Sequence, residues 1–89
     1  NQRGEIVRVV GEVVAIEKIS SAQDVLLRDE SGAQFVRLWR VVAERAPVEV
    51  GMTIDVVGRV RLSRQRRLFI EPALPQDVSV VRLPEKQTS

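Results

Sequence analysis

The chain contains two long runs of mostly β-branched residues, and a single glycine interrupts each of them. Glu5–Ile19 has Gly11 near its middle, and Thr53–Leu62 has Gly58. Branched side chains favour extended backbone, whereas a glycine inside a strand marks a bulge or a sharp bend. Such strands bend around a core, so we predict a small, strongly coiled β barrel. Closure would also leave no unpaired, aggregation-prone edges on these Val-rich strands.

The composition fits one small domain and excludes several kinds of chemistry. The 89 residues include 17 Val and 5 Ile, and the net charge is +2. Without Cys or His, the chain cannot form disulfides, Cys/His zinc sites, haem ligands or His-based catalytic triads. No apolar stretch could span a membrane and no signal sequence is present, so we expect a cytoplasmic protein without a membrane partner. Because it lacks an initiator Met, we expect a piece of a longer or N-terminally processed protein.

Shorter strands are predicted between and after the two long runs. Each alternates apolar and polar residues and ends at turn-forming residues. The predicted strands are Asp24–Asp29, Gln34–Arg40, Arg67–Glu71 and Asp77–Leu83, and the predicted turns are Ser20–Gln23, Asp29–Gly32 and Ser63–Arg66. The connector Val41–Met52 has room for one turn of helix before Pro47. We expect residues 1–83 to form one domain and 84–89 to form a flexible tail.

Five blocks of the sequence resemble the OB fold of nucleic-acid-binding modules, such as those of replication protein A and of tRNA-anticodon-binding domains. The blocks are VRVVGEV (Val7–Val13), VLLRDESG (Val25–Gly32), VRLW (Val36–Trp39), VGMTIDVVGRV (Val50–Val60) and LFI (Leu68–Ile70). The resemblance implies an all-β, five-stranded Greek-key OB barrel with a short connector between strands three and four. The predicted Asp77–Leu83 strand would be an addition to it. The resemblance also implies that ligands bind on strands two and three, between the loops that join strands one to two and four to five.

The third predicted strand carries the strongest candidate binding residues. If Val36 and Leu38 face the core, alternation places Phe35, Arg37 and Trp39 together on the outer face. Aromatic rings stack on bases and guanidinium groups contact phosphates, so this face suits single-stranded nucleic acid. In the alternative interpretation, Trp39 closes the barrel and Phe35 packs under the connector.

A basic hairpin between strands four and five is the second candidate. Arg forks bind phosphates bidentately and stack on bases, and the nine residues 59–67 contain no acid. The predicted binding residues here are Arg59, Arg61, Arg64, Arg66 and Arg67, to which we add Lys18, Arg28 and Arg40 near the same face. Ser20, Ser21 and Gln23 would line the opposite wall by analogy with OB domains. A solvated hairpin, or one that meets an anionic protein, is the alternative.

The remaining polar residues predict no catalysis. Asp29 and Glu30 are expected to stabilise a turn, and no paired carboxylates, Gly-rich phosphate loop or activated serine stand out. We therefore expect no enzyme, no cofactor and no metal site.

From these features we expect a module that binds single-stranded nucleic acid, with DNA as the expected ligand. With one Trp, two Phe and no Tyr, it should bind weakly, mainly by electrostatics with some stacking, and with little sequence specificity. We expect it to work beside other domains or subunits of a larger replication, repair or recombination protein. Two alternatives stay open: a protein-interaction OB domain that uses the barrel face or the Asp77–Leu83 strand, and an exported bacterial OB protein for a small or anionic ligand.

Overall fold

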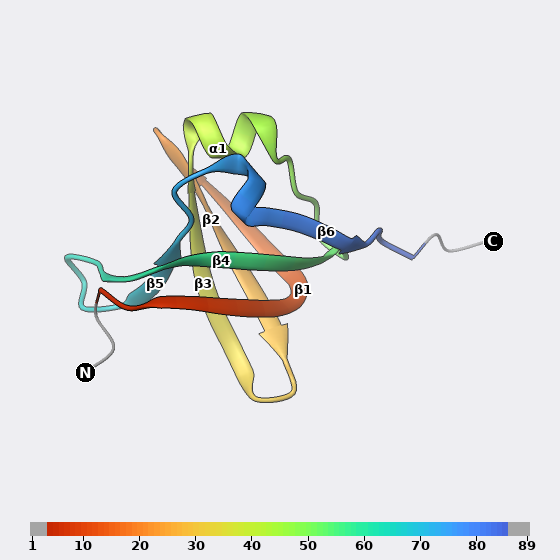
Figure 1. Cartoon of the computed structure of the whole chain (residues 1–89), viewed down its shortest axis with the longest axis horizontal. Coiled ribbons are helices and arrows are strands. Elements are labelled where there is room, and N and C mark those ends of the chain that lie inside the picture. Colours follow the sequence, from red (N-terminus) through yellow and green to blue (C-terminus); the bar gives the residue numbers. More distant parts are fainter. Residues whose placement is uncertain (1–3, 86–89) are drawn as a thin grey trace.

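The computed structural model describes residues 4–85, in which the strands form a strongly curved sheet with a short helix at one end (Figure 1). The strands are β1 (Ile6–Ile19), β2 (Ala22–Asp29), β3 (Gly32–Trp39), β4 (Thr53–Leu62), β5 (Leu68–Glu71) and β6 (Val78–Arg82). The helix α1 (Arg40–Arg45) joins β3 to β4, and a 3-10 turn, η1 (Pro75–Asp77), precedes β6. The last residues of the predicted tail, 86–89, lie outside the described residues. Within residues 4–85, no helix has the length and apolar character needed to cross a membrane.

The sheet closes on itself through β1 and β4. β1 pairs antiparallel with β2 over its second half and with β4 over its first half. β3 lies parallel to β5, and β5 pairs antiparallel with β4, so the order β1-β2-β3-β5-β4 returns to β1. β6 extends the sheet by pairing with β4. The predicted five-stranded barrel, with a helical turn after the third strand and an additional C-terminal strand, is confirmed.

β1 changes its partner at Glu12, which pairs with both β2 and β4. Gly11 is buried beside this point, and a Cβ built there would lie 3.0 Å from the carbonyl oxygen of Arg28. Glycine at this position therefore allows β1 and β2 to approach each other closely. The bulge that we expected at Gly11 lies further along, where the β1–β2 register shifts between Val13 and Ala15. Before the bulge the odd-numbered residues face the core, and after it the even-numbered residues do. This change explains why both the odd-numbered and the even-numbered positions of the strand carry apolar residues.

The core consists of inward-facing residues from every barrel strand and is closed at one end by α1. Its fully buried side chains include Val13, Val25, Val36, Leu38, Ile54, Val56 and Ile70. Val42 of α1 is also buried, whereas Trp39 is 41% exposed, so the alternative in which Trp39 closes the barrel is wrong. β3 ends at Trp39 because the next residue, Arg40, begins the helix. The first predicted turn is shorter than expected, because residues 22 and 23 already belong to β2.

Gly58 lies where β4 passes between two neighbouring strands. It pairs with Val7 of β1, and a Cβ built on it would lie 2.7 Å from Cγ2 of Ile70 and 2.8 Å from the backbone of Glu71. Backbone atoms cannot rotate away as the end of a flexible side chain can. Closure of the barrel between β4 and β5 therefore requires glycine at this position.

We expect Gly58→Ala to lower the free energy of unfolding by about 1–3 kcal/mol, because the added methyl forces β4 and β5 apart. Urea denaturation followed by Trp39 fluorescence measures the change. Val57→Ala, at the exposed neighbouring position, is the matched control and should change stability by less than about 1 kcal/mol. Equal stability of the two variants would contradict the proposed packing constraint.

Candidate functional site

The outer face of the β2–β3 ladder carries the predicted aromatic strand. Val36 and Leu38 are fully buried, so Phe35, Arg37 and Trp39 point outward, as the alternation predicts. The antiparallel register places Asp24 opposite Arg37, Leu26 opposite Phe35 and Ala22 opposite Trp39. β5 runs parallel to β3 on its other side, with Phe69 opposite Phe35. The face thus extends over β2, β3 and β5.

A partly buried ion pair occupies the middle of this face. Nε of Arg37 donates to Oδ1 of Asp24 at 2.8 Å, and Nη2 donates to Oδ2 at 3.0 Å. The hydrogen bonds that Arg37 donates to Asp24 raise the pKa of Arg37, and partial burial opposes this effect. The Arg37 guanidinium also lies over the Phe69 ring, 4.5 Å from its centroid. Arg37 therefore links two strands and an aromatic ring, and much of its hydrogen-bonding capacity is already used within the protein.

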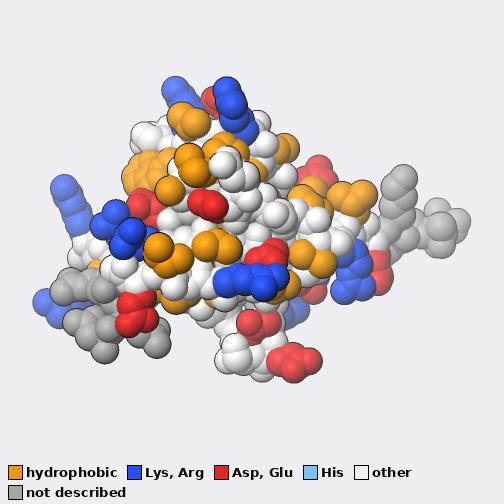
Figure 2. All heavy atoms as spheres, in the orientation of Figure 1, with side chains coloured by type: hydrophobic (Ala, Val, Ile, Leu, Met, Phe, Trp, Pro, Cys, Tyr) orange, Lys and Arg blue, Asp and Glu red, His pale blue; other side chains and the backbone are white. Residues whose placement is uncertain are grey.

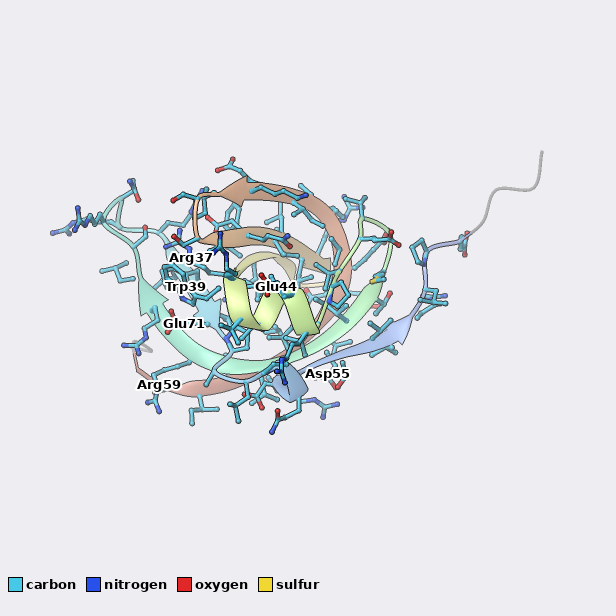
Figure 3. All side chains as sticks on the ribbon, turned by 90° about the horizontal axis from the view of Figure 1, so that it is seen from above. Arg37, Trp39, Glu44, Asp55, Arg59 and Glu71 are labelled. Atoms are coloured by element: carbon cyan, nitrogen blue, oxygen red, sulfur yellow. The ribbon has the colours of Figure 1, made fainter. Side chains whose placement is uncertain are left out.

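Glu71 holds the edge of the exposed indole. The Trp39 Nε1–H donates to Oε2 of Glu71, and Nε of Arg61 donates to Oε1 of the same carboxylate at 3.2 Å. Figure 3 shows Arg37, Trp39, Glu71 and Arg59 following one another along one side of the barrel. The indole keeps an exposed surface while its polar edge is fixed, which is the arrangement that stacking on a ligand needs.

The β4–β5 loop, residues 63–67, projects from the edge of the barrel (Figure 1), and its last residue, Arg67, reaches back to the aromatic strand. The Ser63 N–H donates to the carbonyl of Arg67 at 2.9 Å, which closes the hairpin. The Arg67 guanidinium lies 4.0 Å from the centroid of the Phe35 ring, and Nη2 of Arg67 is 3.8 Å from Oδ2 of Asp24. The basic hairpin and the aromatic strand, far apart in the sequence, therefore form one continuous surface.

Arg66 adopts a backbone conformation that favours glycine. Its φ is 63°, which costs a non-glycine residue about 1–2 kcal/mol. Arg64 and Arg66 are exposed, and neither forms an ion pair within residues 4–85. Lys and Arg side chains gather at this end of the molecule (Figure 2). A charged side chain on a strained turn is typical of functional loops.

The other predicted basic residues lie at the margins of the face. Arg28 is exposed near the β2–β3 turn, where Asp29 accepts hydrogen bonds from the backbone N–H groups of Ser31 and Gly32. These bonds, together with one from the Ser31 hydroxyl, lower the pKa of Asp29 and support its predicted structural role. Arg59 donates to the carbonyl of Gly4 at 2.8 Å.

Lys18 and Arg40 lie at the opposite end of the face, beside α1. Both line a pocket between the β1–β2 turn and the helix, together with Ser20, Ser21 and Gln23. They therefore stand apart from the basic hairpin, and Arg40 belongs to the helix instead of the third strand.

Three residues of the site were missed by the sequence analysis: Asp24, Phe69 and Glu71. The missed carboxylates matter because they bind cationic and N–H groups that we predicted to contact nucleic acid. Asp24 could have been found, since the predicted Asp29–Gly32 turn fixes a register that places it opposite Arg37. Within residues 4–85, no group of three or more acidic side chains is arranged to hold a metal ion.

Comparison with solved structures identifies the fold. No protein-family model and no curated protein matches the sequence. The OBody AM1L10 bound to hen egg-white lysozyme superposes with a TM-score of 0.75 at 18% identity, covering 92% of this chain and 83% of that one. The OBody AM3L15 bound to the same protein gives 0.74 at 16% identity, covering 98% and 85%. Asparaginyl-tRNA synthetase from Pyrococcus horikoshii gives 0.75 at 16% identity, covering 96% of this chain and 22% of the synthetase.

These likenesses show an OB fold, as the sequence resemblance implied. At such low identities they show the fold alone.

We expect Asp24→Asn to lower the free energy of unfolding by about 1–3 kcal/mol, because it leaves the Arg37 guanidinium partly buried without its carboxylate partner. Thermal or urea unfolding measures the loss. Glu30→Gln removes the same charge from an exposed turn and is the matched control, with an expected change within about 0.5 kcal/mol. A loss no larger for Asp24→Asn than for the control would show that the ion pair does not stabilise the fold.

Proposed function

We propose that this OB domain binds single-stranded nucleic acid, with DNA as the principal ligand, across the outer face of β2, β3 and β5. In this proposal it is a binding module without catalytic activity. It acts in the cytoplasm as part of a larger protein of DNA replication, repair or recombination. Bases stack on the exposed indole of Trp39, with the half-buried Phe35 beside it under Arg67, while the arginines of the β4–β5 loop contact the phosphates.

The observation that carries the proposal is the contact between Arg67 and Phe35. With the guanidinium 4.0 Å from the ring centroid, the last residue of the basic loop contacts the aromatic strand directly. Arg64 and Arg66 then project from the same loop with their side chains exposed. A nucleic-acid strand with one base stacked on Trp39 and running toward the loop therefore has its phosphates within the field of these cations.

The internal carboxylates limit how strongly the face attracts phosphate. Asp24 is bound to Arg37, and Glu71 is bound to Arg61 and Trp39. The most available phosphate-binding groups are consequently the exposed arginines of the loop and Arg28. Few phosphate contacts imply weak binding and a shallow salt dependence, with a slope of about −0.7 per contact for single strands.

A protein partner is the second candidate function. The face combines guanidinium groups, aromatic rings and carboxylates, a mixture that is common in protein interfaces. Two of the similar structures are OBodies bound to hen egg-white lysozyme, so OB domains of this shape are compatible with a protein ligand. This candidate predicts binding that is indifferent to single-stranded DNA.

Replacing two loop arginines, in Arg64→Ala/Arg66→Gly, should weaken binding of a dT12 oligonucleotide about tenfold in low salt. The slope of log K against log salt concentration should become shallower by about 1.4, because two phosphate contacts are lost. Quenching of Trp39 fluorescence measures the affinity, since this is the one Trp of the chain. Glycine at 66 relieves the positive φ, so the variant should remain folded.

Arg45→Ala/Arg82→Ala, on α1 and β6, is the matched control because it changes the net charge equally. It should retain most of the affinity. If both double variants lose affinity equally, net charge rather than the proposed face governs binding. If dT12 changes neither the fluorescence nor the mobility of the native protein at high micromolar concentration, the proposal fails and the protein-partner candidate is favoured.

A further inference from the structure

A pocket between the β1–β2 turn and α1 lies beyond the part of the face that the proposed function uses, at the turn predicted to form its opposite wall. Its volume is about 350 Å³, at the lower end of the roughly 300–1,000 Å³ that small-molecule sites occupy. One nucleotide is a ligand of this size class. The pocket is lined from the turn by Ser20, Ser21 and Gln23 and from the helix by Arg40 and Ala43.

The pocket is held in shape by backbone contacts. The Arg40 N–H donates to the carbonyl of Ser21 at 2.9 Å, which fixes the start of α1 against the turn. Lys18 pairs with Gln23 across the hairpin, and Ala43 packs against the core. A ligand would therefore meet a preformed site, which lowers the entropy lost on binding.

The pocket is open to solvent, and its lining combines apolar side chains with polar and charged ones. Ile19, Ala43 and Pro47 supply apolar surface that suits the flat face of a heterocycle. The two hydroxyl groups and the Gln23 amide supply donors and acceptors for base or sugar edges.

The charges of the rim favour a nucleotide over a simple anion. Lys18 and Arg40 line the pocket, and neither forms an ion pair with another residue of the described chain. These two cations suit a phosphate group. Glu44, which lies on the same helix, also lines the pocket and opposes the binding of a phosphate that brings no other contacts (Figure 3). Additional contacts to a base are therefore needed for binding.

The pocket lies where the proposed binding face ends. Trp39 is the last residue of β3, Arg40 directly follows it, and Ala22 of the pocket wall pairs with Trp39. If one base of a nucleic-acid strand stacks on the indole, the next nucleotide of that nucleic acid would therefore lie near the β1–β2 turn and α1.

We propose that this pocket binds one nucleoside monophosphate unit, namely the nucleotide that follows the base stacked on Trp39. This proposal rests on the proposed function, because the nucleotide would come from a single strand bound to the face. The chemistry of the pocket is equally suited to a free nucleotide. The experiment therefore tests the pocket and the face separately.

The test follows backbone amide shifts of the whole 89-residue chain during titration with three probes: the four 5′-deoxynucleoside monophosphates, inorganic phosphate and dT12. At least one monophosphate should shift the amides of residues 18–23 and 40–44 in a saturable way, with a dissociation constant of about 1 mM. Inorganic phosphate at the same concentration should not. Lys18→Ala/Arg40→Ala should weaken monophosphate binding about tenfold, while Arg45→Ala/Arg82→Ala, with the same charge change, should leave it intact.

The outcomes separate the two proposals. If no monophosphate shifts the pocket amides while dT12 shifts residues 35–39 and 63–67, the pocket proposal is wrong and the binding face stands. If phosphate alone reproduces the shifts, the pocket binds an anion without reading a nucleotide, and the inference is overturned. If a monophosphate binds and dT12 does not, the pocket stands as a free-nucleotide site and the proposed function fails.

Discussion

Closure of the barrel depends on the exchange of partners by β1, which pairs with β4 up to Glu12 and with β2 from Glu12 onward. The exchange is possible because Gly11 allows β1 to approach the backbone of β2 and Gly58 allows β4 to approach β5. Once the sheet is closed, β5 must enter between β3 and β4, parallel to β3. This arrangement brings Phe69 and Glu71 beside the aromatic strand, so the surface that we propose to bind nucleic acid is a direct consequence of barrel closure.

The ion pairs of this protein, more than its net charge, determine where positive charge is available to a ligand. The net charge of +2 suggests a weak field, yet the acids are placed so that different arginines are neutralised to different extents. Asp24 and Glu71 bind arginines in the middle of the face, and Asp55 binds Arg8 on the β1–β4 side. The hydrogen bond from Arg8 lowers the pKa of Asp55. The β4–β5 loop consequently keeps two arginines, Arg64 and Arg66, that form no ion pair within residues 4–85, and their field can act on a ligand.

Most of the fold could be predicted from the sequence because strands and tight turns are determined by residues that are close together in the chain. Alternation identified the strands, and the Asp29–Gly32 turn sets the β2–β3 register, from which the opposition of Asp24 and Arg37 follows. The role of Glu71 could not be predicted in this way. It depends on the parallel pairing of β3 with β5, which no turn encodes, and on a loop that includes the positive φ of Arg66. The bulge near Val14 was equally hidden, since both alternations of β1 are apolar.

The ion pairs of the face also explain how a domain with few aromatic residues can present a defined surface. Trp39 and Phe35 would otherwise be free to rotate, and the entropy of fixing each exposed ring would oppose ligand binding. Glu71 holds the indole edge, and Arg67 covers the phenyl ring. The same contacts that remove phosphate-binding capacity from Arg37 and Arg61 therefore order the rings in advance. On the proposed binding face, the contacts that fix the rings therefore weaken the attraction of phosphate. Arg64 and Arg66 of the loop, which form no ion pair within residues 4–85, attract phosphate without that loss.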